Sequence, residues 1–148
     1  MSIAVKFSLG DIYAKIDKQT DDNIDMLIDR MFYIGEACVN TARESGSYNN
    51  ITGNLRSSIG YVVLHDGEVV NFGKSEAYSG VKGDGAEGIS AAKTFLDELI
   101  LEGHTGITLI VVAGMNYAIY VEAIHNKDVL TSAKLKAEQL LRELEIVK

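Results

Sequence analysis

The segment 60–72 reads GYVVLHDGEVVNF and predicts a β-hairpin. At its centre, Asp66 and Gly67 form a two-residue turn signal that typically joins two antiparallel strands. Apolar and β-branched residues on both sides extend the predicted strands over residues 60–65 and 68–72. The hairpin therefore indicates a sheet that is antiparallel at this point.

Two further strands are predicted from segments that lie far from the hairpin in the sequence. The segment Ser2–Phe7 alternates apolar residues with polar or small ones, which is typical of a strand with one buried face. Residues 107–112 are almost all apolar, which favours a central strand that is covered on both sides. The expected sheet is therefore small, and either mixed or mostly antiparallel.

Three helices are predicted around this sheet. Residues 21–44 carry apolar or small side chains at alternating spacings of four and three, which indicates a long amphipathic helix. A middle helix is expected over residues 89–103 and a C-terminal helix from about Lys127. We therefore predict an α+β fold in a single domain over residues 1–148, with a long N-terminal helix, a middle helix and a C-terminal helix packed on the sheet.

The segment 115–124 fits two patterns. Apolar residues at alternate positions from Tyr117 onward suit a strand. The spacing of Tyr117 and Tyr120 suits instead a short helix that is capped by Asn116. We favour the helix.

The composition describes an acidic globular chain. Of its 148 residues, 47% are hydrophobic and 24% are charged, which is ordinary for a folded domain. The 14 Lys and Arg residues against 21 Asp and Glu residues give a formal net charge of -7, which argues against general nucleic-acid binding. The uncharged stretch of residues 106–121 is shorter than the roughly 20 residues of a membrane span, so no membrane contact is expected.

Few patterns in the chain suit catalysis. Residues 83–88 match G-x-G-x-x-G, but a dinucleotide site needs a strand that runs directly into the first glycine, and a polar loop precedes it here. The three histidines are isolated from one another and from the single cysteine, Cys38, without the spacing of metal ligands. We predict no catalytic, cofactor-binding or metal-binding residue and hence no enzyme. A small enzyme built from residues distant in the sequence is the alternative.

The segment 73–88 is predicted to be a flexible, exposed loop. The chain contains no proline, so that glycine supplies its turns. We interpret this loop as a partner-contacting segment that becomes ordered on assembly. The alternative is a surface loop without a function. The glycines of the loop are Gly80, Gly83, Gly85 and Gly88.

Two segments together resemble a known family. Residues 51–60 read ITGNLRSSIG, and residues 112–122 read VAGMNYAIYVE. The first resembles the T-G-x-L-R-x-S-I segment of phage tail-completion proteins, also called head–tail joining or neck proteins, and the second resembles their Y-A-x-x-V-E segment. With the flanking helices, the resemblance to this gene-product-ten-like family of long-tailed bacteriophages covers residues 20–145. The chain departs from the family after Glu122, where an aromatic-Gly-Thr turn often follows.

The resemblance implies a structural virion protein, encoded by a phage or a prophage and synthesised in the cytoplasm of the host bacterium. Such proteins form rings, commonly six-fold, at the head–tail interface, with neighbouring neck or tail proteins as partners. DNA passes through the lumen of the ring without specific binding, which an acidic chain suits. The family needs no catalysis and no cofactor. The alternative is a cytosolic protein-interaction adaptor or regulator without a virion role.

The resemblance also suggests roles for single residues in the structural or interface motif. Thr52 is expected to cap the turn, and Arg56 either pairs with Glu122 or lies exposed and contributes little to stability. Tyr117 and Tyr120 are expected to pack in the core or at an interface. The residues of the motif are Thr52, Gly53, Asn54, Leu55, Arg56, Tyr117, Tyr120 and Glu122. Of these, Gly53 is expected to give backbone freedom and Leu55 to fill the core.

Overall fold

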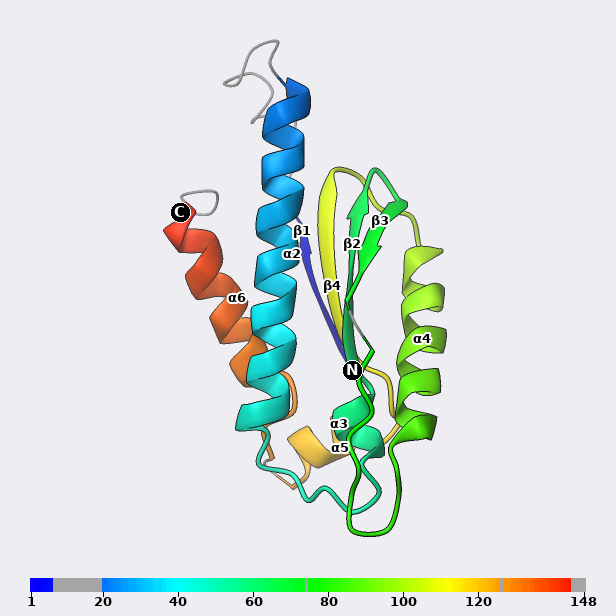
Figure 1. Ribbon diagram of the computed structural model, residues 1–148. Helices are drawn as coiled ribbons and strands as arrows, with labels where there is room; N and C mark the ends of the chain where they lie inside the picture. Colours follow the sequence, from blue (N-terminus) through cyan, green and yellow to red (C-terminus); the bar gives the residue numbers. More distant parts are fainter. Residues whose placement is uncertain (7–19, 74, 126, 145–148) are drawn as a thin grey trace.

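The computed structural model describes residues 1–6, 20–73, 75–125 and 127–144 (Figure 1). Within these ranges the chain forms four strands and five helices, so that the predicted α+β class is confirmed. The strands are β1 (Ser2–Lys6), β2 (Ile59–His65), β3 (Glu68–Phe72) and β4 (Ile107–Ala113). The helices are α2 (Thr20–Ser45), α3 (Asn54–Ser57), α4 (Ala86–Ile100), α5 (Ala118–Ala123) and α6 (Thr131–Glu143).

The sheet has the strand order β1-β4-β2-β3, and every neighbouring pair of these strands is antiparallel. The hairpin turn forms as predicted, since Asp66 and Gly67 have φ angles of 50° and 85°, the left-handed conformation that a two-residue turn of type I′ requires. All seven residues of β4 are buried, which confirms the predicted central strand. The sequence predicted a sheet that is either mixed or mostly antiparallel, and the described sheet is antiparallel.

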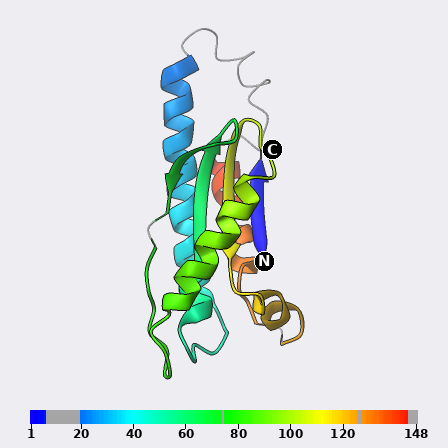
Figure 2. The same ribbon diagram turned by 90° about the vertical axis from the view of Figure 1, so that its right-hand side faces the viewer.

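Helices cover both faces of the sheet: in Figure 1, α2 and α6 lie on one side of the strands and α4 lies on the other, and Figure 2 shows α4 in front of the sheet. Alternate residues of β2 and β4 contribute to two separate cores. Tyr61 and Val111 belong to the core beneath α2 and α6, whereas Val62 and Ile110 pack with Leu96 of α4. This alternation explains why β4 is apolar along its whole length.

Several boundaries differ from the sequence prediction. The first strand ends at Lys6, and Phe7 lies outside the described residues. The middle helix begins at Ala86 and ends at Ile100, so the loop before it is shorter than the predicted 73–88. The C-terminal helix begins at Thr131 and not near Lys127.

The late start of α6 has a local cause. The Asp128 carboxylate accepts hydrogen bonds from the backbone N–H and the hydroxyl of Ser132, and this contact caps the helix from outside. Apolar spacing alone does not record such a cap.

The favoured helix within residues 115–124 is present as α5, but Asn116 does not cap it. Tyr117 is the N-cap residue, and no side-chain hydrogen bond caps the helix there. Among the described residues, no helix is long and apolar enough to cross a membrane.

Candidate functional site

The two motif segments meet in space at one end of the sheet. Ile59 pairs with Ala113 where β2 and β4 lie side by side. The backbone N–H of Gly114 donates to the Ser58 carbonyl oxygen at 3.0 Å, and the N–H of Met115 donates to the Ser58 hydroxyl at 3.4 Å. Ser58 is fully buried, so these bonds are shielded from water. Segments 51–60 and 112–122 therefore form one structural unit.

The glycine-rich loop packs against the first of these segments. The N–H of Lys82 donates to the Ile51 carbonyl oxygen at 2.7 Å, and the N–H of Val81 donates to that of Asn50 at 3.4 Å. Earlier in the loop, the N–H of Tyr78 donates to the Ser57 hydroxyl at 2.7 Å. Backbone atoms of the loop thus bond directly to the segment that carries the T-G-x-L-R pattern.

Glycines make this close approach possible. Gly53 has a φ of 80°, and a Cβ atom built on it would overlap the carbonyl oxygen of Tyr78. A Cβ atom on Gly85 would overlap the Ser57 hydroxyl, and one on Gly88 would overlap the Asn54 carbonyl oxygen. Gly88 lies in the first turn of α4 and not in the loop.

Gly80 and Gly83 face the same segment from within the loop, where added Cβ atoms would crowd the backbone of residues 51–53. These glycines therefore allow backbones to touch, which is a role separate from flexibility. The loop's partner contact stays a prediction.

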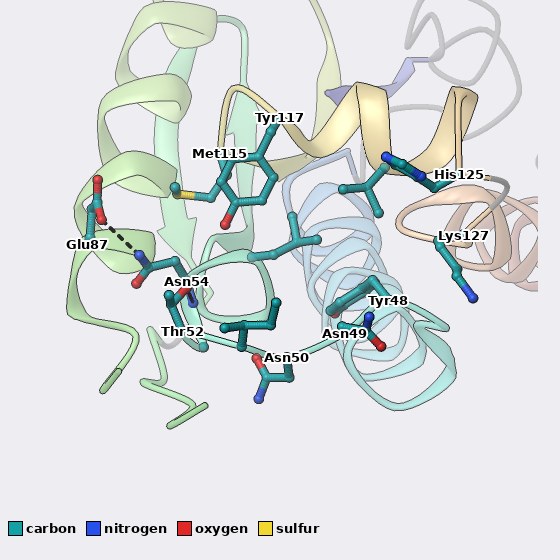
Figure 3. A pocket seen from close by; sticks show the side chains of 14 residues that line it. Tyr48, Asn49, Asn50, Thr52, Asn54, Glu87, Met115, Tyr117, His125 and Lys127 are labelled. Carbon is teal, nitrogen blue, oxygen red and sulfur yellow. Dashed lines mark hydrogen bonds between the residues drawn. The ribbon is translucent and has the colours of Figure 1, made fainter. Parts of the chain in front are cut away.

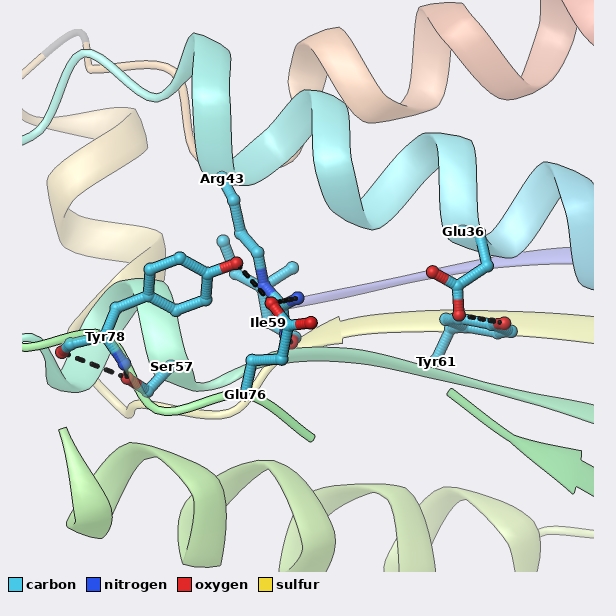
Figure 4. A network of polar contacts seen from close by, with 7 residues as sticks. All are labelled: Glu36, Arg43, Ser57, Ile59, Tyr61, Glu76 and Tyr78. Atoms are coloured by element: carbon cyan, nitrogen blue, oxygen red, sulfur yellow. Dashed lines mark hydrogen bonds and ion pairs between the residues drawn. The ribbon is translucent and has the colours of Figure 1, made fainter. Parts of the chain in front are cut away.

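Arg43 of α2 anchors the loop from the other side (Figure 4). Its side chain is only 5% exposed; Nη2 donates to the Ile59 carbonyl oxygen at 2.9 Å, and Nη1 lies 3.5 Å from the carboxylate of Glu76. The guanidinium also lies over the ring of Tyr78, 5.0 Å from its centre. Tyr78 donates its hydroxyl to Glu76 at 2.6 Å, and this bond raises the pKa of the phenol because it favours the protonated form. One buried arginine thus links α2, β2 and the loop.

A pocket of about 630 Å³ opens between the two motif segments (Figure 3). Asn54 and Glu87 lie at one end of it, joined by a hydrogen bond of 2.8 Å, and His125 and Lys127 lie at the other. Its apolar lining includes Tyr48, Ile51, Leu55, Met115, Tyr117 and Val121. The pocket therefore has an apolar interior between an acidic and a basic end.

Of the two motif tyrosines, Tyr117 lines this pocket, and neither belongs to the buried core. Tyr117 is 40% exposed and Tyr120 is 59% exposed. The partial burial of Tyr117 raises the pKa of its phenol, since burial disfavours the anion. Ile119 and Ile124 of the same segment are also exposed, so that α5 presents an apolar surface. The core alternative is wrong for both tyrosines, and the interface alternative stays a prediction.

The other motif residues meet their expectations unevenly. Leu55 is buried in the larger core, as expected. Thr52 accepts a hydrogen bond from the N–H of Asn54 at 3.3 Å, but the N-cap residue of α3 is Gly53. Thr52 thus lies one residue before the N-cap position, and its hydroxyl binds the first N–H of the helix.

Of the two alternatives for Arg56, the ion pair with Glu122 is wrong, and the side chain is half-buried and not fully exposed. The carboxylate of Glu122 accepts hydrogen bonds from the N–H and the hydroxyl of Thr131, and so holds the start of α6. The guanidinium of Arg56 lies over the ring of Tyr48, 5.8 Å from its centre. Each charged group is therefore engaged by a neighbour that sequence spacing did not reveal.

The search of the described residues found no group of three or more His, Cys, Asp or Glu side chains that could hold a metal ion. No family model, curated protein or solved structure matches this chain.

Sequence reasoning missed Arg43, Tyr78 and Ser57. An arginine near the end of a helix ordinarily points into solvent and stabilises the helix dipole. The signal available was its position beside the apolar stripe of α2, directly after the buried Ala42.

Proposed function

We propose that this chain is a structural virion protein at the head–tail interface of a long-tailed bacteriophage, a neck or tail-completion protein that forms a ring around the DNA channel. The observation that carries the proposal is the meeting of segments 51–60 and 112–122 in one bonded unit. Each segment resembles the same family separately, and their contact in space is what a single shared structural unit would require.

The surface beside this unit supports a role in assembly. The short helix α5 exposes Ile119 and Tyr120, and its C-cap residue Ile124 is exposed as well, with exposed fractions of 53%, 59% and 64%. Exposed large apolar side chains that lie close together in the sequence of one short helix are typical of surfaces that contact other proteins. Tyrosine contributes strongly to such contacts because its ring is large and rigid and its hydroxyl tolerates water.

The charge of the chain supports the location around DNA. A formal net charge of -7 on each copy repels the phosphate backbone. A ring with this charge lets DNA pass without holding it, since non-specific DNA binding depends on neutralising phosphates with Lys and Arg. Ring formation, the virion location and the neighbouring neck or tail partners are parts of the same proposal.

An early stop codon in the gene, in a phage or prophage that encodes the chain, tests the proposal. We expect the chain to be detected by mass spectrometry in purified wild-type virions. We expect lysates of the mutant to contain heads and tails that are not joined, as seen by electron microscopy, and the wild-type gene in trans to restore infectious particles. Infectious virions that lack the chain would contradict the proposal.

Complementation with surface variants tests whether α5 is the assembly surface. We expect Tyr120→Asp to fold normally and to fail in complementation, because it places a charge on an apolar contact. Leu101→Asp is the matched control, since Leu101 is 85% exposed in the turn after α4, far from α5 in Figure 1. Equal complementation by both variants would remove α5 from the assembly surface.

A further inference from the structure

We propose that the outer face of α2 in one copy docks into the pocket between the motif segments of a second copy. This inference rests on the proposed ring, because it names the two surfaces through which neighbouring copies make contact. It commits the pocket to a helix of this same chain.

The outer face of α2 carries the first part of the argument. Asp22, Met26, Asp29 and Tyr33 recur at spacings of four, three and four, which places them on one face of the helix. The side chains of Met26 and Tyr33 are 54% and 60% exposed, although the opposite face of the same helix packs on the sheet. A second, outward stripe with two large apolar side chains is unusual for a helix that has only one buried face.

The pocket has the size and lining to accept these two side chains. Its volume of about 630 Å³ and its apolar lining, which includes Leu55 and Met115, suit a pair of large apolar groups. An amphipathic helix that places side chains one or two turns apart into an apolar groove is a recurring mode of recognition. Met26 and Tyr33 are two turns apart, about 10 Å along the helix axis.

The charges at the edges match as well. Asp25 and Arg30 are five residues apart, which places their side chains about 140° apart around the helix axis. They therefore lie on opposite flanks of the outer stripe. Both residues are exposed. The pocket has Lys127 at one end and Glu87 at the other (Figure 3). A docked helix can therefore set its acidic flank against the basic end and Arg30 against the acidic end.

The two surfaces lie at opposite ends of the molecule. Figure 1 shows the start of α2 at one end of the long axis, and α3 and α5, which border the pocket, at the other. A copy cannot fill its own pocket with its own helix face across that separation, so the match requires a second copy. Contacts between unlike surfaces of identical chains are heterologous, and they generate a ring when the rotation between copies closes.

Directed cross-linking between two variants of the full chain tests this contact. One preparation carries Asp22→Cys, one turn before Met26 on the outer face, and the other carries His125→Cys, and the two are mixed with a short bismaleimide. The native Cys38 is fully buried, and burial raises the pKa of its thiol to about 12, so that the introduced thiols react first. We expect D22C and H125C chains to form a mixed dimer at least about tenfold faster than D22C and L101C chains, because docking raises the local concentration of the two groups.

Charge exchange sharpens the test. Adding Lys127→Glu to the H125C chain is expected to slow its cross-linking with D22C, and adding Asp25→Lys to the D22C chain is expected to restore it. The inference is overturned if H125C reacts with D22C no faster than L101C does, or if the charge exchange leaves the rate unchanged. Detection of the chain in virions is a separate measurement, so the proposed function stands if this contact alone fails.

Discussion

At the scale of the residue, Gly53 lies in a turn that has no room for a side chain larger than a hydrogen atom. Its φ of 80° is nearly the same as the 81° of Gly103, so both positions disfavour other residues for the same backbone reason. They differ in their surroundings: a Cβ atom on Gly103 would meet nothing within 4 Å, whereas one on Gly53 would overlap the backbone of the loop. Alanine substitutions at these two glycines therefore separate the cost of backbone strain from the cost of disturbed close packing.

We expect Gly103→Ala to lower the free energy of unfolding by about 1–2 kcal/mol, the cost of the left-handed conformation alone. We expect Gly53→Ala to lower it by about 3–5 kcal/mol, because the loop must also move away from the added methyl group. Urea denaturation of the two variants measures the difference. Equal losses would show that the loop does not pack against Gly53 in solution.

A second prediction at this scale concerns Cys38 and alkaline pH. Its thiol has a pKa of about 12 in the folded chain, raised by burial from about 9. Between these values the unfolded chain loses the thiol proton and the folded chain keeps it, so stability falls as the pH rises. Below pH 9 both states keep the proton, and the contribution is constant.

We expect the free energy of unfolding to fall with pH more steeply in the wild-type chain than in a Cys38→Ala variant. The difference in slope should approach about 1.4 kcal/mol per pH unit between pH 9 and 12. All other residues are the same in the two chains, so the comparison isolates the thiol. Parallel stability curves, measured by denaturation at several pH values, would contradict the prediction.

Single residues also show how far sequence reasoning reaches. The Asp66 and Gly67 turn was predictable because its chemistry is local. The partners of Glu122 and Arg43 were not, because each depends on which distant segments fold beside it. Spacing reveals the face on which a side chain lies, and it does not reveal the neighbour that the face meets.

At the scale of the element, the loop between β3 and α4 is the feature that sequence pattern describes least well. Its glycines suggested freedom, but Gly80 and Gly83 lie against the backbone of the first motif. The same composition thus fits a mobile loop and a tightly packed one. Helices and strands were easier to predict, because a periodic pattern records one buried face along many residues.

Hydrogen exchange distinguishes the two states of this loop. We expect the amides of Tyr78 and Lys82 to exchange more slowly than unstructured amides, because they donate to the Ser57 hydroxyl and to the Ile51 carbonyl oxygen. We expect Arg43→Met to speed their exchange, since it removes the anchor that holds Glu76 and Tyr78.

The matched control for this measurement is Arg30→Met, which changes an exposed arginine on the same helix. It should leave exchange in the loop as in the wild-type chain. Exchange at unstructured rates in the wild-type chain itself would favour a loop that orders only on assembly.

At the scale of the whole molecule, the acidic charge makes a prediction about DNA. We expect no binding of the purified chain to double-stranded DNA at about 10 µM protein and low salt, where non-specific DNA-binding proteins begin to bind. Fluorescence anisotropy of a labelled duplex measures this, with a basic DNA-binding protein as the positive control. Binding that weakens steeply with added salt would show a local basic surface that contacts phosphate.

The architecture as a whole was predictable to the level of its class. Amphipathic patterns placed three helices and a central strand, and the hairpin set the antiparallel direction. The strand order was beyond reach, because nothing in the sequence of Ser2–Lys6 specifies that it pairs with β4. The meeting of the two motif segments follows from that order, since it brings the end of β4 beside the start of β2.

The pairing of β1 with β4 has a consequence for how the chain is made. The β2–β3 hairpin joins strands only two residues apart, and it can close as soon as it leaves the ribosome. Strand β1 is synthesised first but must wait until residues 107–113 emerge before it finds its partner. We therefore expect β1 to be among the last strands to join the sheet during synthesis. Its pairing with β4 closes the whole chain segment between these two strands, and this segment must first be synthesised.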